Sequence, residues 1–297
     1  MTSESKLTTR MKNLVPGKTF LVGEYSVLRE GAAIGLATSP GFEIVPLQTH
    51  NQNQQLPFHP ESPAGRYLRA TGERIRYQLN DPYLAAGIQG GLGRSTAEFF
   101  AVLSEADRAK PFSEIRKLYL DLHAGESQPP SGADLAFQYY GQVCVASLES
   151  KNFQSHAWPF KNLHFFIVAT GRKVATHQHL AELKPDQLNH LPRQSDLVIR
   201  AFVNKVEIEF LDTLRNWVEV LNAAGLTHEN SNELRKQLET NSDILLVKPC
   251  GALGADVVLV FCESAKQYKV RDALLVARLQ IVAGVKDLCR GVGQDVG

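Results

Sequence analysis

The sequence lacks the cysteine spacings, long apolar runs and leader pattern that mark several classes of protein. Its four cysteines, at positions 144, 250, 262 and 289, form no CxxC pair and no zinc-ligand spacing, so we expect reduced, buried thiols. The longest apolar stretches, such as residues 163–169, are far too short to span a bilayer. The first ten residues are polar and contain no apolar h-region of a signal peptide. We therefore expect a cytoplasmic protein with no membrane partner.

The chain also lacks an excess of charge of either sign. It contains 32 Lys and Arg against 31 Asp and Glu, a formal net charge of +1. This balance argues against a nucleic-acid partner, which a basic patch or stripe would indicate. Hydrophobic residues make up 43% and charged residues 21%, an ordinary globular composition. At 297 residues the chain is long for one core, so we expect two domains or one large two-lobed fold.

The periodicity of apolar residues predicts a mixture of helices and strands. Helical spacing is found at 66–79, 95–109, 112–123 and 197–223. Strands with turns are predicted for 12–45, 163–169 and 280–285. Residues 48–65 are polar and proline-rich, which is typical of a surface loop. The pattern changes near 155–165, and this change predicts a boundary between lobes.

Three turns that contain glycine are candidates for holding a ligand. The first is PGK at 16–18, where a lysine at a strand's edge is, taken alone, most simply a solvated head on an apolar stem. The second is GGLGRS at 90–95, directly ahead of a predicted helix. The third is KPCGALGAD at 248–256, where a plain turn between two apolar runs would explain the segment alone.

The second turn has two interpretations of equal weight when it is considered alone. Glycines ahead of a helix let the backbone approach a phosphate closely, and unpaired N–H groups at the helix start favour anions. Ser95 and Glu98 also have the spacing of a capping box, which would use the same N–H groups internally. The turn is not a Walker A loop, because no GK[ST] follows its glycines.

Taken together, the three turns resemble the signature motifs of the GHMP small-molecule kinases. PGK-x4-GEY, GGLGRS and KPCGALGAD occur in the order that this family shows. PPSGADLAFQYYG, which ends at Gly141, resembles the stretch with the family's catalytic aspartate. ATGRKVATHQHL at 169–180 is similar to a TG-x4-T loop on the acceptor side in the mevalonate-pathway branch. The resemblance covers most of the chain.

The resemblance implies an α+β, two-lobed GHMP kinase fold. Its N-terminal lobe would be like ribosomal protein S5 domain 2, and its C-terminal lobe ferredoxin-like. We accordingly expect a flexible tail over 1–11, an ATP-binding domain over 12–160 and a C-terminal domain over 161–297. A monomer and a homodimer are both compatible with the sequence.

Details of the motifs resemble the phosphomevalonate kinase branch. Glu24-Tyr25 matches its GEY, and both SGAD and KPCGALGAD are similar to its sequences. This implies ATP- and Mg²⁺-dependent phosphorylation of phosphomevalonate to diphosphomevalonate in isoprenoid precursor biosynthesis. The alternatives are a mevalonate kinase and a catalytically silent protein of the same fold that binds a nucleotide or ligand. A diphosphomevalonate decarboxylase matches less well around SGAD.

The resemblance also implies roles for individual residues. Asp134 would act on the acceptor as a base or as an orienting group, and Lys18 would stabilise charge on the transferring group. Ser95 would face Mg²⁺. The ATP phosphates would contact Gly90, Gly91, Leu92, Gly93, Arg94, Ser95 and Thr96. The acceptor would contact Glu24, Tyr25, Ser131, Gly132, Thr170, Gly171, Thr176, Gly251, Ala252 and Gly254.

Three positions depart from the family pattern. Arg94 replaces the first serine of the usual GLGSS, where a cation either adds a phosphate contact or crowds the loop. Leu253 and Ala255 replace glycines of the third motif, and each adds a Cβ where the backbone approaches closely or needs a positive φ. His177 and His179 lie in a polar loop and are better explained as solvated side chains than as metal ligands.

Overall fold

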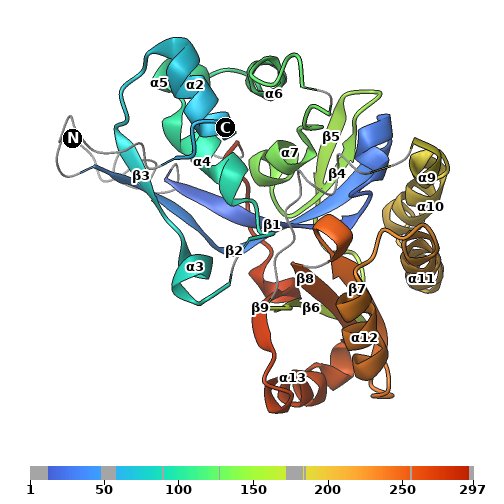
Figure 1. Ribbon diagram of the computed structural model, residues 1–297. Helices are drawn as coiled ribbons and strands as arrows, with labels where there is room; N and C mark the ends of the chain where they lie inside the picture. The colour runs from blue at the N-terminus through green and yellow to red at the C-terminus, as the bar shows by residue number, and fades with distance from the viewer. Residues whose placement is uncertain are drawn as a thin grey trace.

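Two antiparallel sheets organise the protein (Figure 1). The computed structural model describes residues 13–47, 58–88, 90–126, 128–171, 183, 185–254 and 256–293. The first sheet has the strand order β1-β2-β4-β5, with β3 paired to β2. Its strands are β1 (Leu14–Val22), β2 (Ala32–Pro46), β3 (Tyr77–Asn80), β4 (Val143–Ser147) and β5 (Asn152–His156). The second sheet has the order β7-β8-β6-β9. Its strands are β6 (Leu163–Ala169), β7 (Ile244–Cys250), β8 (Val257–Glu263) and β9 (Gln280–Gly284).

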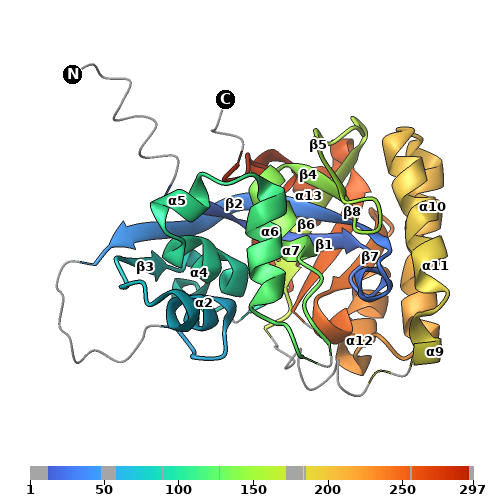
Figure 2. The same ribbon diagram turned by 90° about the horizontal axis from the view of Figure 1, so that it is seen from above.

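Helices of the N-terminal half cover one face of the first sheet (Figures 1 and 2). They are α2 (Pro63–Thr71), α4 (Arg94–Val102), α5 (Glu105–Arg108), α6 (Phe112–Asp121) and α7 (Ala133–Tyr140). The short α3 (Pro82–Ala85) contacts β2 from the other side, toward the second sheet (Figure 1). Helix α7 contacts β1, β2 and β4, and α4 contacts both β1 and α7. Gly35 of β2 permits this approach, because a Cβ there would lie 2.1 Å from the fully buried ring of Phe137. The sheet therefore holds the N-termini of α4 and α7 close to β1.

The second sheet is buried on both faces. Along β8, Val257, Leu259 and Phe261 join the large core that also contains residues of the first sheet, while alternate side chains enter a smaller core. Helices α11 (Glu207–Ala223) and α12 (Glu229–Leu238) pack on β7, and α13 (Gln267–Val276) packs on β8 and β9. Helix α10 (Leu191–Val203) packs on α11 and on β1 and β2 of the first sheet, and α9 (Pro185–Leu188) precedes it. The four cysteines are free, and all but Cys289 are buried. None of the helices among the described residues combines the length and hydropathy needed to cross a membrane.

Predictions of element type are confirmed for short segments and wrong for two long ones. Strands at 163–169 and 280–285 and the helix at 112–123 are confirmed by β6, β9 and α6. The single helix over 197–223 is wrong, because 204–206 form a turn in which Lys205 has φ 60° and α10 folds back on α11. The helix over 66–79 is also wrong. Gly72 ends α2 at φ 68°, and the chain continues as β3, paired to β2.

Other boundaries differ from the sequence-based expectations by smaller amounts. The helix predicted over 95–109 is two helices, because Ser104 caps a new helix with its hydroxyl on Asp107 N. The loop predicted over 48–65 ends earlier, since α2 begins at Pro63, and 48–57 lie outside the described residues. The division into domains at 160 stays a prediction. The chain passes from the first sheet to the second at residues 157–162, but one large apolar core contains residues of both sheets.

A buried ion pair joins the two halves beside the candidate site. The Lys248 Nζ, in β7, lies 2.6 Å from Glu24 Oε1, just after β1, and the two side chains are 0% and 6% exposed. Lys248 Nζ also donates to Pro249 O at 3.0 Å. Next to the pair, Leu253 N donates to Tyr25 Oη at 2.9 Å. The GEY and KPCGALGAD segments, more than 200 residues apart in sequence, are therefore bonded directly to each other.

We expect Lys248→Met to lower the free energy of unfolding by about 3–5 kcal/mol, because the Glu24 carboxylate would remain buried without its partner. Glu24→Leu combined with Lys248→Met should recover most of this loss, since both charges are then replaced by apolar groups. Urea denaturation measures each value. The control is Lys117→Met, which breaks an exposed pair with Asp121 and should cost less than about 1 kcal/mol. A Lys248 variant as stable as that control would contradict the assignment.

The pair also predicts how stability depends on pH. Burial alone would lower the pKa of Lys248, but the Cys250 sulfur and the Glu24 carboxylate raise it above its usual value. A raised lysine pKa contributes stability that is present below the unfolded pKa of about 10.4 and is lost as the pH rises through the folded pKa. The stability difference between the wild type and the double variant Glu24→Leu with Lys248→Met, in which neither position titrates, should thus stay constant between about pH 6 and 9 and change only at alkaline pH, where the wild type loses stability. A difference that changes near neutral pH would contradict this.

Candidate active site

The glycine turn at 90–95 leads into α4 without a side-chain cap. Gly93 is the N-cap residue, at φ 91° and ψ 20°, and no side chain among the described residues caps the first N–H groups of α4. Glu98 does not form the capping box, because its Oε1 accepts from Arg94 Nε at 2.9 Å instead. The capping-box interpretation is therefore wrong. The uncapped N–H groups and the helix dipole together suit an anion such as a phosphate.

Glycines are required in this turn because neighbouring segments contact its backbone. Gly91 has φ 78°, and a Cβ there would lie 2.3 Å from the Cβ of Asp256 in the third motif. A Cβ on Gly93 would lie 2.7 Å from both Lys18 Cγ and Gln138 Nε2. The turn is thus packed on one side by the third motif and on the other by β1 and α7.

The structure brings Lys18 and Asp134 together at this turn. Lys18 Nζ lies 3.0 Å from Asp134 Oδ2, and the side chains are 10% and 37% exposed. Lys18 N donates to Leu92 O at 2.9 Å, which ties β1 to the glycine turn. Asp134 lies in the first turn of α7, and its Oδ1 is buried with no hydrogen-bond partner among the described residues. A paired lysine and a carboxylate with one unused oxygen suit charge neutralisation next to an acceptor group.

Gln138 is a site residue that the motifs alone did not indicate. It is fully buried on α7, one turn after Asp134. Its Nε2 donates to Pro16 O at 2.8 Å and to Gly93 O at 3.1 Å, and its Oε1 accepts from the hydroxyl of Thr96. One amide thereby connects β1, the glycine turn and α4 to the helix that carries Asp134. Gln138 could have been identified from the sequence, because it is a polar residue four positions after Asp134 within an apolar helical run.

The remaining phosphate candidates lie at the start of α4. Ser95 is exposed at this helix end, and Thr96 is buried against Gln138. The Arg94 guanidinium lies 2.9 Å from Glu98 Oε1 and 3.4 Å from Asp81 Oδ2. Burial raises the pKa of Glu98, and the hydrogen bond from Arg94 partly offsets this. Arg94 therefore serves first as the counter-ion of two carboxylates.

The acceptor candidates fall into two groups. Near Asp134, Ser131 Oγ accepts from Ala133 N at 3.2 Å, and Gly132 caps α7 at φ 75°. At the end of β6, Thr170 donates to Asp256 O from its N and its Oγ1, at 3.2 and 3.0 Å, and Gly171 follows at φ 73°.

The third motif forms the 3-10 turn η2 (Ala252–Gly254). Leu253, where the family has glycine, has φ 53°, so the chain keeps the left-handed backbone despite a Cβ. A Cβ on Gly251 would lie 2.1 Å from Asp256 Oδ2, and one on Gly254 would lie 2.5 Å from Pro249 Cβ. Thr176 and Ala255 lie outside the described residues.

The side chains of Glu24 and Tyr25 are used to hold the third motif. Tyr25 is buried, and burial raises the pKa of its hydroxyl above the usual value. Their predicted contact with the acceptor stays a prediction, as do the roles of the other candidates.

The residues present fit a Mg²⁺ ion held largely by substrate phosphates. Within the described segments no group of three or more His, Cys, Asp or Glu side chains is placed to hold a metal. Mg²⁺ commonly uses one or two protein oxygens, several waters and substrate phosphates. The exposed Ser95 hydroxyl and the unpartnered Asp134 Oδ1 are oxygens of this kind.

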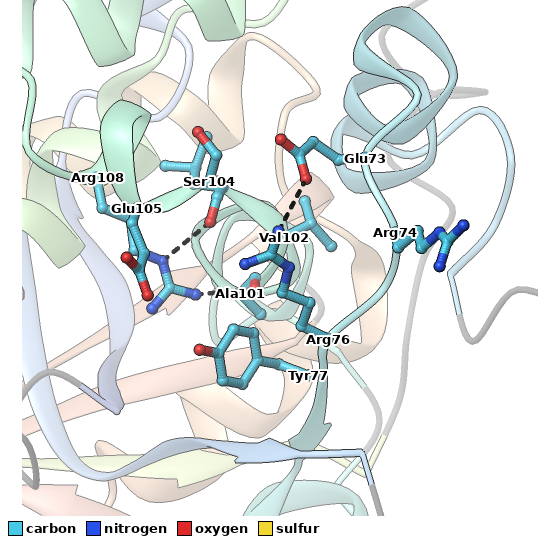
Figure 3. Close-up of a pocket in the computed structure, with 10 residues that line it drawn as sticks. Glu73, Arg74, Arg76, Tyr77, Ala101, Val102, Ser104, Glu105 and Arg108 are labelled. Atoms are coloured by element: carbon cyan, nitrogen blue, oxygen red, sulfur yellow. Dashed lines mark hydrogen bonds and ion pairs between the residues drawn. The ribbon is translucent and has the colours of Figure 1, made fainter. Parts of the chain in front are cut away.

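A small hollow at the opposite end of α4 is separate from this site (Figure 3). Arg108 donates from Nε to Leu103 O at 3.2 Å and from Nη2 to Ala101 O at 2.9 Å, and it stacks on the ring of Tyr77. The hollow measures about 20 Å³, which is room for a water molecule at most. Arg108 therefore stabilises the end of α4, and this hollow is too small for a nucleotide.

Comparison with known proteins gives no match by sequence and several by structure. No family model and no curated protein matches the chain. It is similar to the Streptococcus pneumoniae phosphomevalonate kinase in complex with phosphomevalonate and AMPPNP, with a TM-score of 0.65, 14% identity, and 91% of this chain and 98% of that chain covered. The Methanococcus jannaschii mevalonate kinase has a TM-score of 0.61 and 18% identity, with 91% of this chain and 96% of that chain covered. The Lactococcus lactis galactokinase complexed with galactose has a TM-score of 0.66 and 11% identity, with 98% of this chain and 99% of that chain covered. The chain therefore has the two-lobed α+β fold of the GHMP kinases.

Proposed function

We propose that the protein is an ATP-dependent small-molecule kinase whose acceptor is phosphomevalonate. The observation that carries the proposal is the Lys18–Asp134 pair beside an uncapped glycine turn and helix N-terminus. Phosphoryl transfer depends mainly on positioning and on neutralising charge, and these groups supply both. The coarser conclusion, a GHMP-type kinase, has the support of the fold. The choice of phosphomevalonate rests on the motif resemblance.

In this proposal the N–H groups of 93–95 bind the ATP phosphates, and Lys18 offsets charge on the transferring phosphoryl group. Mg²⁺, when bound, neutralises charge on the β- and γ-phosphates. A phosphate oxygen of the acceptor forms the new bond to the γ-phosphorus while the bond to the β–γ bridging oxygen breaks and ADP leaves. That acceptor oxygen is already ionised, so Asp134 orients the acceptor and need not remove a proton.

Mevalonate kinase activity is the second candidate. Mevalonate presents an alcohol, whose proton must be taken up as the bond to phosphorus forms. The unpartnered Oδ1 of Asp134 is suited to that task as well. Solved structures of similar fold include a Leishmania major mevalonate kinase in complex with R-mevalonate, so both acceptors are tested below.

We expect Asp134→Asn and Lys18→Met each to lower kcat at least about 100-fold, because each removes charge from the transfer site. Coupled ADP release with Mg·ATP measures this, with mevalonate and phosphomevalonate tested side by side. Turnover of phosphomevalonate alone supports the proposal, and turnover of mevalonate alone selects the second candidate. ATP binding without turnover of either would favour a silent binder.

The matched control is the pair of Lys266 and Asp243, 3.0 Å apart and 36% and 27% exposed. Asp243→Asn should leave kcat within about twofold of the wild type, because Asp243 precedes β7 and Lys266 follows β8, both outside the glycine turn. Normal turnover in both Asp134→Asn and Lys18→Met, with unchanged unfolding midpoints, would remove these residues from the mechanism.

Gln138→Leu should raise the KM for ATP about tenfold or more, because Gly93 O and Pro16 O lose their shared donor and the glycine turn shifts. Steady-state kinetics at varied ATP measures this. The control is Ser195→Ala, which removes a buried hydrogen bond to Ser26 remote from the turn. That variant should lose stability to a similar extent and keep its KM for ATP. If Gln138→Leu and Ser195→Ala had equal KM values for ATP, Gln138 would have only a structural role.

A further inference from the structure

A cavity of about 180 Å³ lies where the two halves of the chain face each other. Ile88, just ahead of the glycine turn, lines it from the N-terminal half. Thr170, Asp256 and Arg278 line it from the second sheet. Gln280 Nε2 donates to Ala86 O at 3.1 Å, which fixes the segment after α3 beside the start of β9 (Figure 1).

The glycine turn separates the cavity from the Lys18–Asp134 pair. Asp256, in the cavity wall, packs against Gly91 of this turn, and Lys18 packs against Gly93. Two residues span at most about 7 Å of extended chain. A molecule of a few carbon atoms is long enough to extend over this distance.

Among the described residues that line this cavity, Arg278 is the one with a cationic side chain. Its guanidinium has no ion pair or hydrogen bond in the part of the chain that the structure describes. Its backbone is left-handed, at φ 57°, in the position after α13 where glycine is the usual residue. Arg278 N donates to Leu275 O at 2.9 Å, so the helix end fixes the base of the side chain.

We propose that Arg278 binds the carboxylate of the acceptor, at the end of that molecule remote from the group that receives the phosphoryl. A guanidinium fork pairs with a carboxylate through two parallel hydrogen bonds. Mevalonate and phosphomevalonate both carry a carboxylate opposite the reacting oxygen. The acceptor of this protein is then an organic acid and not a neutral sugar. The inference rests on the proposed function, and it deepens it by assigning the acceptor's anionic end.

The kinetic test compares Arg278→Gln with Arg271→Gln. Arg271 is an exposed arginine on α13, the helix that Arg278 follows, and it is outside the residues that line the cavity. Arg278→Gln should raise the KM for phosphomevalonate about 10- to 100-fold, which corresponds to one lost charge-assisted bond, and leave the KM for ATP within about twofold. Arg271→Gln should change neither value. An unchanged acceptor KM in Arg278→Gln overturns the proposal.

A binding test gives an answer even where no turnover is found. Isothermal titration uses mevalonate and its neutral methyl ester, which keeps the terminal hydroxyl but lacks the ionised carboxylate. Wild-type protein should bind the acid at least about tenfold more tightly than the ester, and Arg278→Gln should lose this preference. Arg278→Gly removes the side chain and relieves the left-handed strain, and it serves as a second variant in the same titration. Preference for the acid without turnover retains the anion site and rejects the kinase. Equal binding of acid and ester by wild-type protein, or of the acid by wild type and both variants, rejects the anion site.

Discussion

The close packing of one short turn is the constraint on which the rest of the site depends. Gly91 abuts the third motif at Asp256, and Gly93 abuts Lys18 and Gln138, with no space for a Cβ at either position. Three segments that are far apart in sequence, the third motif, β1 and α7, therefore pack directly on this turn. In return, the turn fixes the distances between the candidate lysine, the candidate aspartate and the uncapped start of α4. Folding and site geometry are thus set by the same contacts.

Where the chain departs from the family motifs, the structure contains a compensating contact. Leu253 keeps the left-handed backbone of the glycine that it replaces, at a cost of about 1–2 kcal/mol. Its N–H is bonded to Tyr25 Oη, and its carbonyl accepts from His228 N at 2.7 Å. Arg94 replaces a serine and is neutralised by Asp81 and Glu98. Both residues are therefore held by contacts with described parts of the chain.

The sequence motifs predicted which segments form the site. They did not predict the residues outside the motifs that connect these segments. Lys18 and Asp134 were each expected to take part in the transfer, because each belongs to a recognisable motif. Gln138 and Arg278 belong to none, and their importance arises from what the fold places beside them. The single helix over 197–223 was wrong for a related reason, since apolar periodicity continues across the turn at 204–206 although Val203 and Val206 are 47% and 44% exposed. The spacing of apolar residues along the chain shows which side chains are apolar. It does not show which other element of the fold buries them.

The two lysine–carboxylate pairs near the turn have the same chemistry, and burial separates their roles. Lys248 and Glu24 are 0% and 6% exposed, so no ligand can compete for either charge, and the pair joins the two halves. Lys18 and Asp134 are 10% and 37% exposed, and one oxygen of Asp134 has no partner within the described chain. A pair that is partly open to solvent can exchange its internal contact for one with a ligand, at far lower desolvation cost than a buried pair. The buried pair therefore holds the site in place, and the open pair is the one available for chemistry.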